Sequence, residues 1–151
     1  MQRRPEEVMV VVWRRSEAGP EFLVLERSPE RQGYWHLVAG GLDEGEEWAQ
    51  AAARELREET GLDAPVADLG LRYSYSSAEE PNEKQAALGP GVTEIAVASF
   101  VAEAPRGWEP SLDEEHVGYR WCSEDQAASL LRYAEPEDAL RKTALRLGEG
   151  R

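Results

Sequence analysis

The chain has 151 residues, 41% of them hydrophobic, which suits one domain with an apolar core. Its net charge of −13 argues against binding to polymeric nucleic acid, which requires a basic surface. No apolar run is long enough to cross a bilayer, and a single cysteine, Cys122, excludes an internal disulfide framework. We therefore expect one domain over residues 1–151 in the reducing cytoplasm, with no membrane partner. The sequence leaves the oligomeric state open.

The first part of the chain predicts a β-hairpin followed by a helix. Two β-rich runs, 8–13 and 21–27, flank the turn sequence EAGP. A short apolar segment at 33–41 then leads into a helix expected from about residue 45 to residue 60. Its expected buried face is formed by Ala49, Ala52, Ala53 and Leu56, which recur at helical spacing.

Both ends of this helix carry recognisable signals. Asp43, with Glu46 three residues later, predicts a capping-box-like start, and Gly61 predicts the C-terminal stop.

The second part of the chain predicts further strands and two more helices. Strands are expected at 69–77, 92–104 and 116–122, separated by loops at 78–91 and 105–115. Ser123 is expected to cap a helix at 124–133, and Pro136 to open a last helix at 136–147. The buried stripe of the last helix is expected at Leu140, Ala144 and Leu147. This order of elements predicts an α/β fold with a mixed β-sheet between helices.

The second half of the first helix gathers negative charge close to its C-terminal end. Glu55 lies three and four residues before Glu58 and Glu59, so the three carboxylates share one face. Their mutual repulsion and the partial negative charge of the last helical turn each cost on the order of 0.3–1 kcal/mol. A solvated surface is the ordinary reason for a charged run. Because both effects act in the same direction here, we expect a bound cation instead.

The surrounding residues fit a longer pattern without a mismatch. From Gly40 the sequence reads G-x5-E-x7-R-E-U-x-E-E-x-G-U, where U is a bulky aliphatic residue. The fixed positions are Gly40, Glu46, Arg54, Glu55, Leu56, Glu58, Glu59, Gly61 and Leu62. This pattern is the Nudix box, and the protein resembles a Nudix hydrolase. The resemblance implies the family's α/β/α sandwich with a mixed sheet.

The resemblance also implies a metal-dependent site. In Nudix enzymes, glutamates at the positions of Glu55, Glu58 and Glu59 bind Mg²⁺ or Mn²⁺. Hard cations of this kind prefer carboxylate oxygens and bridge to substrate phosphates. The family's arginine at the position of Arg54, which can reach Glu58 across one turn, orients the cluster. Gly40 is expected to present its backbone carbonyl oxygen near the metal.

The expected chemistry is metal-assisted hydrolysis of a phosphoanhydride in a small phosphorylated, nucleotide-like substrate. The metal neutralises phosphate oxygens and lowers the pKa of a water molecule. Glu55 or Glu58, or else Glu115 from a later loop, accepts the proton of that water. Glu46 is expected to have a supporting role. The competing interpretation is a domain that senses a nucleotide or an ADP-ribose derivative without cleaving it.

Two segments outside the box resemble one subgroup, the dihydroneopterin triphosphate pyrophosphatases, a branch of dNTP-cleaving enzymes. They are GPGVT before the long strand and EEHVGYRW at the next one. The subgroup's Glu-His pair and aromatic-x-Trp strand match Glu115, His116, Tyr119 and Trp121. By this match Glu115 is a further metal ligand or the base, whereas the alternative is a solvated loop acid. Hydrolysis of dinucleoside polyphosphates or of ADP-ribose stays open as an alternative.

Further candidate substrate contacts lie before the box. Arg27 ends a strand where relatives often place a phosphate-contacting cation. Trp35 and Tyr34 are candidates to stack on a base, with packing in the core as the alternative. His36 is a candidate phosphate donor, and His116 is a candidate proton carrier because histidine titrates near neutrality.

Overall fold

The fold is built on a mixed β-sheet, seen in a computed structural model that describes residues 5–76, 78 and 91–149. The strands are β1 (Glu6–Ser16), β2 (Gly19–Arg27), β3 (Trp35–His36), β4 (Val38–Gly41), β5 (Ala67–Ser76), β6 (Glu94–Glu103) and β7 (His116–Cys122). Their order is β3-β2-β1-β6-β5, with β4 also paired to β1 and β7 to β2. β1 and β6 are parallel, whereas the other pairs are antiparallel, and the predicted mixed sheet is confirmed.

The predicted hairpin joins β1 to β2. Ser16 pairs with Gly19 across the turn, and Gly19 has a φ of +113°, a backbone conformation that favours glycine. Along β1, alternate residues enter opposite sides of the sheet. One core cluster contains Val8, Val10 and Val12, and the other contains Met9, Val11 and Trp13.

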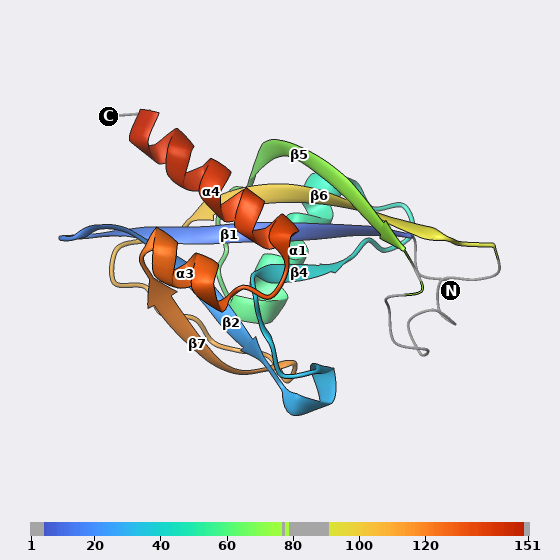
Figure 1. The fold of residues 1–151 in the computed structure, drawn as a ribbon, viewed down its shortest axis with the longest axis horizontal. Coiled ribbons are helices and arrows are strands. Elements are labelled where there is room, and N and C mark those ends of the chain that lie inside the picture. Colours follow the sequence, from blue (N-terminus) through green and yellow to red (C-terminus); the bar gives the residue numbers. More distant parts are fainter. Residues whose placement is uncertain (1–4, 77, 79–90, 150–151) are drawn as a thin grey trace.

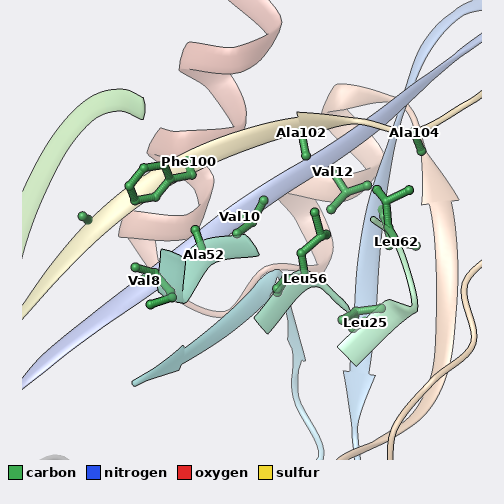
Figure 2. Close-up of a cluster of buried hydrophobic side chains, with 14 of the residues drawn as sticks. Val8, Val10, Val12, Leu25, Ala52, Leu56, Leu62, Phe100, Ala102 and Ala104 are labelled. Carbon is green, nitrogen blue, oxygen red and sulfur yellow. The ribbon is translucent and has the colours of Figure 1, made fainter. Parts of the chain in front are cut away.

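Helices cover both faces of the sheet (Figure 1). They are α1 (Trp48–Thr60), α3 (Glu124–Leu130) and α4 (Ala134–Glu149), with a short 3-10 helix, η1, at Pro29–Arg31. One core cluster joins Leu56 of α1 to Val8, Val10 and Val12 (Figure 2). The other joins Ala127 of α3 and Leu140 of α4 to the opposite face. The α/β/α architecture implied by the sequence is therefore confirmed.

The last two helices differ from the sequence expectation at their ends. Ser123 caps α3 as predicted, and its side chain accepts from the Gln126 N–H at 3.3 Å. α3 ends at Leu130 because Leu131 is extended, with ψ at 130°. α4 begins two residues before Pro136, which occupies its first turn, where a missing N–H costs little. Of the predicted stripe, Leu140 is fully buried, while Ala144 and Leu147 are half-buried.

The loop predicted at 78–91 lies outside the described residues except at its two ends. No helix within the described part of the chain combines the length and apolar character that spanning a membrane requires.

Candidate active site

The acidic helix begins later than the sequence suggests. Glu47 is the N-cap of α1 and forms a capping box with Gln50, whose side chain accepts from the Glu47 N–H at 2.9 Å. The predicted start at Gly45 is wrong, because Gly45 has a φ of +79° and cannot belong to the helix. Asp43 and Glu46 do pair, with the Asp43 N–H donating to Glu46 at 2.9 Å, but they close the loop before the helix. Gly61 ends the helix as predicted, with a φ of +81°.

The buried face of α1 carries a carboxylate. Ala51, Ala52 and Leu56 are fully buried, whereas the predicted Ala49 is exposed. The face is rotated from the expected one because Ala51 and Ala52, rather than Ala49 and Ala53, pack against the sheet. This rotation brings Glu59, one turn after Leu56, into the interior, where its side chain is only 2% exposed.

Glu55 and Glu59 lie together where α1 meets β4. The N–H of Ala39 approaches Glu59 Oε1 at 3.4 Å, and Glu59 Oε2 is buried without a hydrogen-bond partner. Burial raises the pKa of the Glu55 carboxyl. Burial also raises the pKa of Glu59 well above its usual range, and the adjacent Glu55 carboxyl adds to that effect. Within the described residues, no lysine or arginine side chain pairs with Glu59.

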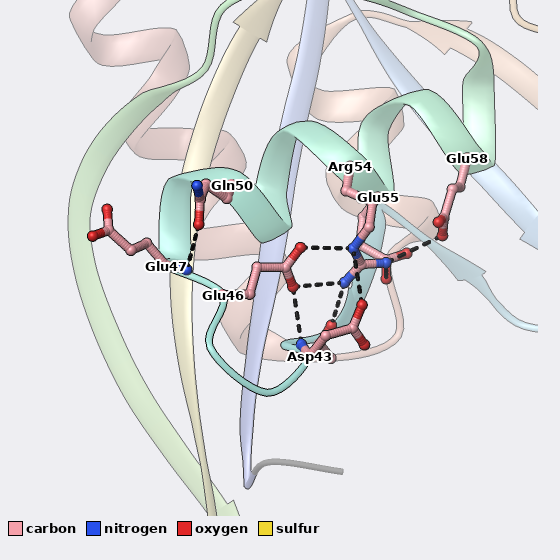
Figure 3. A network of polar contacts seen from close by, with 8 residues as sticks. Asp43, Glu46, Glu47, Gln50, Arg54, Glu55 and Glu58 are labelled. Atoms are coloured by element: carbon pink, nitrogen blue, oxygen red, sulfur yellow. Dashed lines mark hydrogen bonds and ion pairs between the residues drawn. The ribbon is translucent and has the colours of Figure 1, made fainter. Parts of the chain in front are cut away.

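Arg54 neutralises the outer side of the same cluster (Figure 3). Its guanidinium donates two hydrogen bonds to Glu46, at 2.8 and 3.0 Å, and one to Glu55 at 2.8 Å. It also donates to Glu58 at 3.2 Å, which is the contact across one turn that the sequence predicted. A further bond to the Gly41 carbonyl oxygen, at 2.8 Å, ties the helix to β4. The planar fork of arginine is suited to hold several carboxylates at once.

Gly40 leaves room for Glu55. A β-carbon built at position 40 would overlap the carboxyl group of Glu55, so any larger residue displaces that carboxylate. We expect Gly40→Ala to lower kcat/KM about 100-fold, because a misplacement of roughly 1 Å in a reacting group has a cost of that size. A steady-state assay alongside thermal melting checks this. Gly148→Ala, at a helical glycine with open space around it, is the matched control and should keep full activity.

A cleft of about 1400 Å³ opens beside this cluster. Glu55 and Gly40 line it, together with the predicted contacts Arg27 and His36 and the loop acid Glu115. The structure thus brings together residues from β2, β3, β4, α1 and the loop before β7.

The aromatic residues divide between the cleft and the core. Tyr34 lines the cleft and meets Tyr133 edge to face, with ring centroids 5.5 Å apart. Trp35 is not among the lining residues; it packs against the core cluster of α3 and α4, with Arg120 5.3 Å from its ring centroid. This geometry gives no support to the predicted substrate contact of Trp35. Tyr133 had no sequence signal, because it comes to the cleft from between α3 and α4.

His36 is set up as a donor. Its Nδ1 accepts a hydrogen bond from the N–H of Leu37 at 2.8 Å. In the neutral ring the proton then lies on Nε2, which becomes the donor. That arrangement suits the phosphate contact predicted from the sequence.

Glu115 faces a cation that the sequence did not single out. Its carboxylate lies 3.3 Å from the Arg31 guanidinium, and its backbone oxygen accepts from the Ser28 N–H at 2.8 Å. The side chain lines the cleft but is 37% exposed, so both interpretations of it, ligand or base and solvated loop acid, stay predictions.

A family comparison decides the identity. The NUDIX domain family matches residues 3–143. The chain belongs to the Nudix family.

Three individual proteins are similar to this chain over most of its length. The chain is 38% identical over 130 residues to an octanoyltransferase of Myxococcus xanthus, covering 85% of this chain but only 33% of that protein. It is 28% identical over 132 residues to the dihydroneopterin triphosphate diphosphatase of Escherichia coli, covering 86% and 85% of the two chains. The solved Caenorhabditis elegans Ap4A hydrolase superimposes with a TM-score of 0.75 at 25% identity, covering 95% and 98%. Family and named hydrolases together support a pyrophosphohydrolase acting on phosphoanhydrides.

Nudix hydrolases use divalent metal ions, and the residues of this Nudix chain fit one. Glu59 has an unpartnered buried oxygen, Glu55 has a raised carboxyl pKa, and Gly40 keeps space beside that carboxyl. Within residues 5–76, 78 and 91–149, no three acidic, histidine or cysteine side chains already form a closed metal cage. Glu58 is 57% exposed and pairs with Arg54 at 3.2 Å. Its carboxylate would have to turn inward to join Glu55 and Glu59.

Proposed function

We propose that this Nudix protein hydrolyses a phosphoanhydride bond of dihydroneopterin triphosphate or a dNTP and releases pyrophosphate, with Mg²⁺ or Mn²⁺ as cofactor. The observation that carries the proposal is one cleft that is lined both by Glu55, a carboxylate of the α1 cluster, and by the cationic side chain of Arg27. The similarity to the Escherichia coli diphosphatase along most of both chains supports this choice of substrate.

Arg27 is the side chain that favours a phosphorylated substrate. Its Nε is buried without a hydrogen-bond partner, and its guanidinium lies 5.2 Å from the ring centroid of Tyr34. A buried donor without an acceptor is costly, and a phosphate oxygen is an acceptor that matches the guanidinium. A base or pterin ring over Tyr34 would place its phosphates toward this cation.

The carboxylates of α1 would hold the cofactor. Glu55, Glu58 and Glu59, with the carbonyl oxygen of Gly40, are the proposed ligands, and Glu115 is a further one from outside the helix. When bound, the divalent ion supplies neutralising charge for the phosphate oxygens and an acidified water. Arg54 orients Glu55 and Glu58 through the hydrogen bonds described above.

The chain's own residues would carry the proton and the phosphates. Glu55, Glu58 or Glu115 accepts the proton of the attacking water, a role worth roughly 100- to 10,000-fold in rate. Arg27 and the Nε2–H of His36 bind phosphate oxygens and hold the anhydride in line for attack.

Removing the cleft cation tests this arrangement. We expect Arg27→Met to lower kcat/KM about 10- to 100-fold, mainly through KM, because hydrogen bonds to charged groups contribute about 1.5–3 kcal/mol. Arg15→Met makes the same charge change on an arginine that pairs with Glu103 outside the cleft, and should leave both constants unchanged. Equal constants for wild type and Arg27→Met would contradict a phosphate-binding role.

The substrate itself is tested by a panel assay in Mg²⁺ and in Mn²⁺, with products identified by mass. The panel holds dihydroneopterin triphosphate, the dNTPs, 8-oxo-dGTP, ADP-ribose and diadenosine polyphosphates. Pyrophosphate released from the pterin or a dNTP is the expected result. Cleavage confined to ADP-ribose or to a dinucleoside polyphosphate would contradict the substrate while keeping the site. No cleavage with divalent binding intact would favour a nucleotide sensor.

A second candidate substrate is a dinucleoside polyphosphate. The cleft is lined by two pairs of aromatic rings from different parts of the chain, Tyr34 with Tyr133 and Tyr73 with Tyr75 on β5. Two bases joined by a phosphate chain would occupy both. The likeness to the Caenorhabditis elegans Ap4A hydrolase agrees with this alternative.

A further inference from the structure

A histidine is buried beside the acidic pair, outside the cleft lining. His116 begins β7, and its side chain is 1% exposed. Its Nδ1 lies 2.7 Å from Asp113 Oδ1, a short hydrogen bond that fixes the ring. On the other side of the ring, Nε2 lies 3.7 Å from Glu59 Oε1.

Two buried polar atoms at this place lack partners. Neither Nε2 of His116 nor Oε2 of Glu59 has a hydrogen-bond partner, although polar groups this deep are nearly always paired. At 3.7 Å the histidine is just beyond hydrogen-bond reach of Glu59. A shift of less than 1 Å in either side chain would bring them into contact. Asp113 therefore holds the His116 ring in an orientation in which Nε2 faces the Glu59 carboxylate.

We propose that His116, held in place by Asp113, is a positioning residue that orients Glu59 for the divalent cation. The inference depends on the proposed function, in which Glu59 is a metal ligand. A ligating group that is itself hydrogen-bonded by an outer residue keeps a fixed orientation, and loss of the outer residue typically weakens metal affinity about 10- to 100-fold. A ring that is bonded to Asp113 through Nδ1, and that shares a proton with one oxygen of Glu59 through Nε2, leaves the other oxygen for the ion.

Two conservative substitutions separate this role from general packing. In His116→Asn, the amide nitrogen replaces Nδ1 and can still bond Asp113, but nothing replaces Nε2. In His116→Gln, the amide nitrogen reaches the depth of Nε2 and can donate to Glu59. We expect Mn²⁺ affinity, measured by electron paramagnetic resonance of the free ion, to fall about 10- to 100-fold in His116→Asn and to be largely retained in His116→Gln.

Controls and outcomes keep this test sharp. Thr143→Val removes a buried hydroxyl of α4, in the opposite layer, and should leave Mn²⁺ affinity unchanged even if stability falls. Equal losses in His116→Asn and His116→Gln, or no loss in either, would overturn the inference. Absence of saturable Mn²⁺ binding by the wild type would instead overturn the proposed function.

A measurement on the unaltered protein covers the case in which a variant fails to fold. The chain has two histidines, so ¹⁵N-histidine labelling gives a readable spectrum. Adding Mg²⁺ should shift the Nε2 resonance of His116 more than its Nδ1 resonance, because Nδ1 stays bonded to Asp113. If both His116 resonances stay unmoved while Mg²⁺ binds, the positioning role is wrong.

Discussion

Glu59→Gln should abolish most turnover while raising the melting temperature of the metal-free protein. A bound metal contributes several kcal/mol of transition-state stabilisation, so losing a ligand should lower kcat roughly 1000-fold. Without metal, the variant removes a buried carboxylate that has an unpartnered oxygen and a second carboxyl beside it. We expect a gain on the order of 1–2 kcal/mol, or about 2–8 °C. Activity assays and differential scanning calorimetry in EDTA measure the two effects.

The stability gain should depend on pH in a defined direction. The pKa of Glu59 is higher in the folded protein than in the unfolded chain, so folding takes up a proton at this carboxyl. As the pH rises above the pKa of Glu59 in the unfolded chain, the carboxyl therefore destabilises the fold. The advantage of Glu59→Gln should therefore be larger at pH 8 than at pH 5. Mg²⁺ should raise the melting temperature of the wild type and leave that of the variant almost unchanged. Glu103→Gln, at an exposed carboxylate, is the control. A variant that unfolds, or keeps full activity, would contradict this view of the cluster.

Arg54→Met should destabilise the protein and inactivate it together. The guanidinium, whose side chain is 21% exposed, bonds three glutamates and the carbonyl oxygen of Gly41. Removing one partner of a fully buried ion pair costs about 3–5 kcal/mol, and partial exposure reduces this to about 2–3 kcal/mol. The melting temperature should fall by roughly 5–10 °C. Loss of orientation at Glu55 and Glu58 should lower kcat/KM about 100-fold.

Two further variants test whether the effect of Arg54→Met comes from losing the planar guanidinium at this position. Arg54→Lys keeps the charge but replaces the fork with a point charge, so intermediate stability and activity are expected. Arg141 also contacts several carboxylates, but on the exposed surface of α4, and Arg141→Met should change the melting temperature little. If Arg54→Met matches the wild type in both measurements, the network of Figure 3 has no role in the site.

The sequence predicted much of the fold and the carboxylate cluster because both depend on local spacing. Glu55, Glu58 and Glu59 lie on one helix at neighbouring spacing. The end of that helix was predictable because Gly61 adopts the left-handed backbone conformation that glycine favours. The hairpin between β1 and β2 is likewise local. The failures at Gly45 and Ala49 have different origins. The left-handed conformation of Gly45 delays the start of the helix, whereas tertiary packing selects the buried face that excludes Ala49.

Long-range pairings lay beyond what the sequence could show. His116 and Glu59 are brought together by the packing of β7 and α1, and no spacing in the chain predicts that meeting. Arg31 meets Glu115 only because the loop before β7 runs beside η1. Tyr133 faces Tyr34 for a similar reason. In each case the contact depends on how the layers stack rather than on local periodicity.

The central claim is that the carboxylates of α1 support divalent-dependent hydrolysis in the adjoining cleft. The most direct measurement is the rate of pyrophosphate release from dihydroneopterin triphosphate by the wild type, followed from EDTA through increasing Mg²⁺. We predict no release in EDTA and a rate that rises with Mg²⁺ to saturation, with Glu59→Gln inactive throughout. An equal rate in EDTA and in Mg²⁺, or a Glu59→Gln curve that overlays the wild type, would contradict the claim.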